Sequence, residues 1–219
     1  MKKILALAAT VLAGLTLAAC SSTSSQSALD KIKEKGTLVV ATSPDYAPFE
    51  FQALVDGKNE VVGADIMLAQ KIADELGVKL EVSAMSFDNV LSSVQNGKAD
   101  IAIAGLSYSE ERAKVFDFSE SYYQISDVLL IKKDSANSLT SIDAMSGKTL
   151  AVAGYVSQNS DLAVASVEFP TIDENSKVIA LPKGSTELKT AIDKVIAEVK
   201  ASDEFDTFLE KAATYASVE

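Results

Sequence analysis

Residues 65–107 carry the clearest structural pattern in the chain, with the sequence DIMLAQKIADELGVKLEVSAMSFDNVLSSVQNGKADIAIAGLS. Apolar side chains recur at helical spacing in two segments, 65–76 and 87–95, and glycine follows each segment within two residues. Three short apolar or alternating runs predict strands: 37–42, 78–84 and 101–103. The resulting order of strand, helix, strand, helix, strand predicts a parallel α/β sheet.

The loops that follow these strands are expected to form the ligand site. In open parallel sheets, ligands bind beyond the carboxyl ends of the strands. The three loops in question are 43–50, 85–88 and 104–112. We therefore expect them to line one crevice.

The remainder of the chain has weaker signals. Further strands are predicted at 128–131, 149–152 and 178–181, and amphipathic helices at 186–200 and 204–215. The sequence shows no internal repeat and no glycine pattern of the kind that binds phosphate.

The N-terminus is predicted to be an export signal. Two lysines precede the apolar segment 4–19, whose 16 residues are fewer than the roughly 20 that a membrane span needs. The segment ends in Leu-Ala-Ala-Cys, which resembles a bacterial lipobox and predicts acylation of Cys20, for example by palmitate; the alternative is an ordinary signal peptide with a chance cysteine. The polar residues 21–27 then predict a flexible tether. We expect a lipoprotein anchored to the cell membrane outside the cytoplasm.

The composition excludes several classes of function. The chain has 219 residues, 47% hydrophobic and 23% charged, which is typical of one large or two small globular domains. It contains no His and one Cys, so His-based zinc sites and Ser-His or Cys-His nucleophiles are not expected, nor is any metal or other cofactor. The net charge of −11 argues against nucleic acid as a partner.

Arg112 is the only arginine in the chain. Its planar guanidinium binds a carboxylate through two parallel hydrogen bonds, which lysine cannot reproduce. It follows a predicted strand end, where a crevice is expected. The alternative is a surface arginine paired with Glu110 or Asp117.

Four motifs together resemble one known family. Their order and spacing are similar to those of family 3 extracellular solute-binding proteins, the polar amino-acid receptors of ABC importers. The motifs are GTLVVATSPDYAPFEF (36–51), GADI (63–66) with a helix ending in ELGV (75–78), NGKADIAIAGLS (96–107) with SEER (109–112) and VFDFS (115–119), and LPKGS (181–185).

The resemblance implies a fold and a division into domains. The fold is a two-lobed clamshell of the type II periplasmic-binding-protein class, with the first lobe complete. Its division would be a lipoprotein signal peptide (1–20), a tether and linker (21–35), a first lobe (36–123 with 186–219) and a shortened second lobe (124–185). Such a receptor captures an amino acid and delivers it to a permease in the membrane.

The resemblance also assigns ligand-binding roles by position. Arg112 matches the arginine that binds the ligand carboxylate, and Ser107 matches the hydroxyl beside it. Ala104 and Gly105 match backbone contacts to the ligand. Tyr46 and Phe87 match aromatic residues that pack on either side of the ligand side chain; the alternatives are a turn aromatic for Tyr46 and a core residue for Phe87. Ser43 stands where cationic amino-acid binders often have Asp. Asp65 is interpreted as a helix cap and is left outside the site.

The second lobe departs from the family pattern. Only residues 124–180 separate two motifs that a lobe of about 100 residues would ordinarily separate. The anion-binding turn and the acidic residue that receives the ligand ammonium are missing, and Asp161 is expected to be exposed to solvent. Because an unpaired ammonium is costly to desolvate, we expect weakened binding.

Two other functions remain open. One is an enzyme on the same fold, since relatives include a dehydratase and a domain of a lytic transglycosylase; Glu50 is then the nearest candidate for acid–base catalysis. The other is a lipoprotein that acts in adhesion or sensing without transport.

Overall fold

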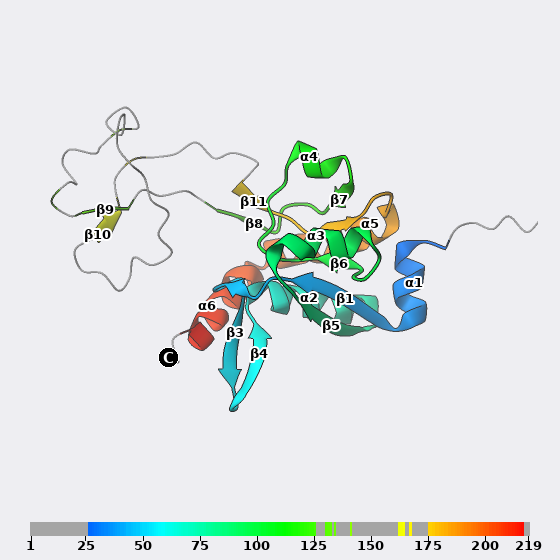
Figure 1. Ribbon diagram of the computed structural model, residues 1–219, viewed down its shortest axis with the longest axis horizontal. Coiled ribbons are helices and arrows are strands. Elements are labelled where there is room, and N and C mark those ends of the chain that lie inside the picture. Colours follow the sequence, from blue (N-terminus) through cyan, green and yellow to red (C-terminus); the bar gives the residue numbers. More distant parts are fainter. Residues whose placement is uncertain are drawn as a thin grey trace, which may run out of the picture.

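A five-stranded sheet forms the centre of the protein (Figure 1). The computed structural model describes residues 26–125, 130–132, 134, 141, 162–164, 167 and 175–216. The strands lie in the order β5-β1-β6-β12-β7. Their bounds are β1 (Thr37–Thr42), β5 (Lys79–Ala84), β6 (Ile101–Ala102), β7 (Phe116–Phe118) and β12 (Ala180–Pro182). The strands β5, β1 and β6 are parallel, as predicted, whereas β12 runs antiparallel to both of its neighbours.

Six helices are described. They are α1 (Ala28–Lys35), α2 (Ala64–Leu76), α3 (Phe87–Gln95), α4 (Glu110–Ala113), α5 (Thr186–Ala201) and α6 (Glu204–Ala216). The four predicted helices are confirmed to within one residue at either end. Their apolar faces were wide enough to identify them from spacing alone, because burial on one side requires a repeat of 3.6 residues.

The sheet separates two apolar clusters. Leu38 and Val40 of β1 face a large cluster with α2, α5 and Phe205, whereas Ala41 faces a smaller one with α3. The same alternation continues in β6 and β12, where Ile101 and Leu181 belong to the large cluster. Because successive strand residues point to opposite faces, this pattern shows that helices cover both faces of the sheet. Each fully buried Leu or Ile contributes about 1.5–3 kcal/mol.

Three smaller sheets complete the described fold. The largest has the order β2-β3-β4, and its hairpin projects away from the central sheet (Figure 1). The bounds are β2 (Asp45–Tyr46), β3 (Glu50–Val55), β4 (Lys58–Val62), β8 (Tyr123–Gln124), β9 (Leu130–Lys132), β10 (Leu162–Val164) and β11 (Ser176–Lys177). Strand β11 pairs with β8, and β10 with β9. The stretch 43–50, predicted as a loop, therefore includes β2 and the start of β3.

The predicted division into lobes is only partly visible. Strand β12 lies in the central sheet although the predicted boundary places it in the second lobe. The signal peptide with Cys20, the predicted strand 149–152 and Asp161 lie outside the described residues. Within the described part, no helix combines the length and apolar character needed to cross a membrane.

Candidate functional site

The loops at the carboxyl edge of the parallel strands pack against one another. The amide of Met85 donates to the carbonyl of Thr42 over 3.0 Å, which ties the loop after β5 to the end of β1. A Cβ added to Gly105 would lie 2.8 Å from Cδ1 of Tyr46, so the loop after β6 contacts the loop after β1. Gly105 also has φ of +52°, a conformation that favours glycine. The fold thus brings these loops to one edge of the sheet.

Arg112 is held by its own loop. Its Nη1 donates to the carbonyl of Ser107 over 2.8 Å, and its backbone amide donates to Oγ of Ser109, the N-cap of α4, over 3.2 Å. Among the described residues it forms no ion pair, and Asp117 instead binds Lys183. The alternative prediction, a pairing with Glu110 or Asp117, is therefore wrong. The guanidinium has five N–H donors, and one of them fixes it beside Ser107.

Ser107 makes contacts with a second cation. Its Oγ accepts a hydrogen bond from Nζ of Lys177 over 3.2 Å, and the two residues also form an isolated antiparallel bridge. The Lys177 Nζ lies 5.9 Å from the centroid of the Tyr46 ring. Ser107 thus lies between Arg112 and Lys177, both of which are cationic.

The two predicted aromatic walls are exposed. Tyr46 is 42% exposed and stacks on Phe49, with ring centroids 5.1 Å apart. Phe87, the first residue of α3, is 46% exposed. The alternative interpretation of Phe87 as a core residue is wrong. Exposed aromatic rings at a loop edge are available to pack against a ligand.

Ser43 and Ala104 are buried beneath this edge. Ser43 is 1% exposed, and its hydroxyl donates to Oδ1 of Asp45 over 3.0 Å. Ala104 is 3% exposed and belongs to the cluster that packs on α3. Asp45 itself is exposed, so Ser43 positions a carboxylate next to Tyr46.

A buried pair of acids lies under the same loops. Glu50 is 1% exposed and Asp65 is fully buried, and their side chains hydrogen-bond to each other. Asp65 Oδ2 also accepts hydrogen bonds from the amide of Gly105 over 2.9 Å and from the hydroxyl of Tyr122 over 3.0 Å. The interpretation of Asp65 as a helix cap is therefore wrong: the N-cap of α2 is Gly63, and the carboxylate binds the loop after β6 instead.

Burial, and then the charge of Asp65, raise the pKa of Glu50 far above its ordinary value. Burial likewise raises the pKa of Asp65, against the opposing effect of its hydrogen bonds. Two buried carboxyls in contact cannot both ionise cheaply, so they share one proton. A shared proton also accounts for two buried oxygens, Glu50 Oε2 and Asp65 Oδ1, that have no other donor among the described residues. Because Glu50 is inaccessible, it supports the loops rather than contacting a substrate.

Two pockets of similar volume lie at the end of α3, and Gln95 lines both of them. Ser107 and Arg112 line a shallow pocket of ≈ 630 Å³ that reaches Gln95 at the end of α3. A second pocket of ≈ 620 Å³ lies between α1, the end of α3 and the turn before α5, and none of the predicted site residues line it. Within the described ranges, no group of three or more Cys, Asp or Glu side chains could hold a metal ion.

The sequence matches a family model over most of its length. Residues 38–214 match the bacterial extracellular solute-binding proteins, family 3. The chain belongs to this family. The resemblance predicted from the motifs is confirmed, and so is the type II periplasmic-binding-protein fold.

Several characterised proteins are similar to this family 3 member. The arginine-binding extracellular protein ArtP of Bacillus subtilis is 32% identical over 207 residues, covering 94% of this chain and 71% of ArtP. An amino acid ABC transporter substrate-binding protein from Streptococcus pneumoniae, solved bound to L-arginine, is 43% identical with a TM-score of 0.72, covering 86% of this chain and 98% of that one. The arginine-bound form of domain 1 from TmArgBP, the ArgBP of T. maritima, is 30% identical with a TM-score of 0.51, covering 77% and 98%.

The sequence-based prediction missed two features of this family 3 protein. Lys177 lies at the start of an apolar run, and only the pairing of β11 with β8 and its bridge to Ser107 bring it to the site. Asp65 was identified, but with the wrong role. A polar residue at a buried helical position was the available signal, because a carboxylate at such a position needs partners from elsewhere in the fold.

Proposed function

We propose that this protein captures an amino acid at the carboxyl edge of its central sheet and delivers it to an ABC permease. Arg112 binds the ligand carboxylate. The observation that carries this proposal is the guanidinium fixed against the carbonyl of Ser107, with no ion pair of its own among the described residues. A planar cation held in this way is suited to a bidentate carboxylate.

Ser107 and the aromatic residues complete the proposed contacts. The hydroxyl of Ser107 donates to the same carboxylate. Tyr46 and Phe87, both exposed, pack against the ligand side chain. The amide of Gly105 already donates to Asp65, so the carbonyl of Gly105 is the backbone group that receives the ligand ammonium.

The relatives support an amino-acid ligand. ArtP is named for arginine binding, and the Streptococcus pneumoniae protein was solved with L-arginine. The arginine-bound domain 1 from TmArgBP supports a site formed mainly by first-lobe residues. This bears on the present chain because every proposed contact lies between residues 46 and 112, outside the predicted second lobe.

Calorimetry with single-site variants tests the proposal. The full-length protein, purified in detergent, is titrated with the twenty common amino acids, beginning with L-arginine. We expect binding by the unmodified chain and a loss of affinity of at least about tenfold in Arg112→Lys, because lysine keeps the charge but not the two parallel hydrogen bonds.

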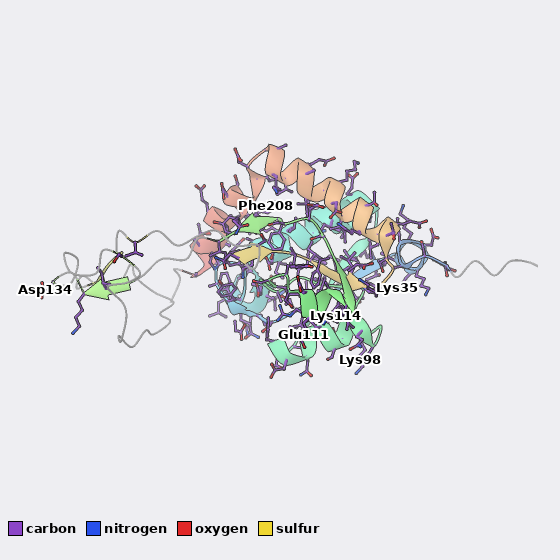
Figure 2. The ribbon with its side chains drawn as sticks, turned by 90° about the horizontal axis from the view of Figure 1, so that it is seen from above. Lys35, Lys98, Glu111, Lys114, Asp134 and Phe208 are labelled. Atoms are coloured by element: carbon purple, nitrogen blue, oxygen red, sulfur yellow. The ribbon has the colours of Figure 1, made fainter. Side chains whose placement is uncertain are left out.

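Lys114→Met is the matched control. Lys114, labelled in Figure 2, is two residues from Arg112 and is exposed. Its substitution should leave the affinity unchanged. If no amino acid binds, or if Arg112→Lys binds as tightly as the unmodified chain, the proposal is wrong.

The lipid anchor is the second part of the proposal. Acylation at Cys20 would hold the protein at the membrane through acyl chains, each buried methylene contributing about 0.8 kcal/mol. Cell fractionation of Cys20→Ala should move the protein from the membrane to the soluble extracytoplasmic fraction. Retention of this variant at the membrane would contradict an anchor at Cys20.

A further inference from the structure

Lys177 is a buried cation at the centre of the candidate site. It is 9% exposed, and lysine is almost never buried to this extent without partners. Its place in the fold is set by β11, which pairs with β8, and by the antiparallel bridge to Ser107. The amide of the next residue, Val178, donates to the carbonyl of Leu106 over 2.9 Å. The backbone thus delivers the lysine to the loop after β6.

The Lys177 side chain contacts two of the proposed ligand-binding residues. Its Nζ donates to Oγ of Ser107 over 3.2 Å and lies 5.9 Å from the Tyr46 ring centroid, within range of a cation–π interaction. Its charge also acts on the buried acids, because it lowers the pKa of Glu50 and that of Asp65 against the larger effect of burial. Lys177 therefore acts both on the acid pair and on Ser107.

The hydrogen bond from Lys177 limits which further groups the Ser107 hydroxyl can bind. A serine hydroxyl has one proton and two lone pairs. Lys177 occupies a lone pair, so the proton of Ser107 is directed to an acceptor other than Lys177. Meanwhile Arg112 donates to the carbonyl of the same serine. An anion that contacts the hydroxyl of Ser107 is then near two positive charges.

We propose that Lys177 is a positioning and specificity-determining residue for ligand binding, which rests on the proposed function. It turns the hydroxyl of Ser107 into a donor for the ligand carboxylate. Its charge, added to that of Arg112, makes the site select a carboxylate over a neutral carboxamide. A lysine with a purely structural role would instead only offset the charge of the acid pair formed by Glu50 and Asp65.

The test compares L-arginine with L-argininamide, in which a neutral carboxamide replaces the carboxylate. The dissociation constants of both are measured by calorimetry for the unmodified full-length protein, Lys177→Met and the control Lys98→Met. We expect the unmodified chain to prefer L-arginine, and Lys177→Met to reduce this preference about tenfold through weaker binding of the acid. Lys98 is exposed and points outward, so Lys98→Met should leave the preference unchanged (Figure 2).

A second variant separates the effect of the Lys177 charge from that of its hydrogen bond to Ser107. Urea denaturation detects a folding defect in either variant. Lys177→Gln keeps a donor for Ser107 but carries no charge, and we expect it to retain part of the preference. If Lys177→Met lowers the urea midpoint while both variants keep the full preference for L-arginine, the role is structural and the proposal is overturned. An unmodified chain that binds L-arginine and L-argininamide equally also overturns it, whereas binding of no amino acid overturns the proposed function as well.

Discussion

The two edges of the central sheet differ in how their charged side chains are paired. At the amino edge, Asp100 lines the pocket of ≈ 620 Å³ and binds Lys35 at 2.7 Å. At the carboxyl edge, Arg112 forms no ion pair among the described residues, and Lys177 is buried beside Ser107. The acids near this edge lie underneath, where they bind each other and the loop.

This difference shows that volume alone does not identify a ligand site. A site for a small charged molecule needs polar groups that are held in place by the residues around and below them. At the amino edge, the carboxylates of Asp100 and Asp117 are instead paired with lysines. Matched residues at the two edges are therefore expected to respond differently to substitution.

The largest expected effect concerns the glycines that precede α2 and α5. A Cβ at Gly63 would lie 2.0 Å from the carbonyl oxygen of Phe49, at φ of +134°, whereas a Cβ at Gly184 would meet no atom within 4 Å, at φ of +83°. Gly63→Ala should therefore lose about 3 kcal/mol or more of unfolding free energy, and Gly184→Ala about 1 kcal/mol. Urea denaturation measures both. Equal losses of unfolding free energy would show that both edges tolerate an added Cβ equally well.

The second prediction concerns the pH dependence of stability. Because burial raises the pKa of Glu50 above its ordinary 4.5, the folded protein holds a proton that the unfolded chain releases above that pH. The stabilisation is complete below pH 4.5 and is lost as pH rises, by up to about 1.4 kcal/mol per unit. Glu50→Gln mimics the protonated acid, so its unfolding free energy should change less between pH 5 and 8.

Asp117 near the amino edge is the control for this experiment. Burial acts to raise the pKa of Asp117, but hydrogen bonds from Lys183, Gly184 and Ser185 lower it overall. A lowered pKa gives a contribution that is present at neutral pH and lost only as pH falls through the folded pKa. Asp117→Asn should therefore lower stability without changing the slope between pH 5 and 8. If the unfolding free energy of Glu50→Gln has the same dependence on pH as that of the unmodified chain, Glu50 and Asp65 do not share a proton.

The smallest expected effect compares two serines. Ser107→Ala should weaken amino-acid binding about tenfold, because one hydrogen bond to a carboxylate is worth about 1.4 kcal/mol. Ser185→Ala, at the pocket of the amino edge, should leave binding unchanged, since its side chain forms no cap of α5. Calorimetry with L-arginine distinguishes the two. If only Ser185→Ala weakened amino-acid binding, the ligand site would lie at the amino edge instead.

Much of the fold could be predicted because its signals are local. Apolar spacing identified α2 and α3, and short apolar runs identified the parallel strands β1 and β6. Strand β12 was predicted as 178–181 but lies at Ala180–Pro182 and is antiparallel, because its partners β6 and β7 are far away in the sequence. Strand direction and register depend on such distant pairings, which spacing does not reveal.

The site was predictable only where residue type and position suffice. Arg112 was identified as the single arginine after a strand end, and the structure ties it to Ser107. The role of Asp65 was missed because a carboxylate at the start of a helix ordinarily caps it. Lys177 was missed because its contact with Ser107 spans 70 positions of the chain.

A crystal structure of the protein with its tightest-binding amino acid tests the central claim most directly. The account predicts the ligand carboxylate within hydrogen-bond distance of the guanidinium of Arg112 and Oγ of Ser107, with its side chain against Tyr46. A ligand bound in the pocket between α1 and α5, or a carboxylate away from Arg112, would contradict it.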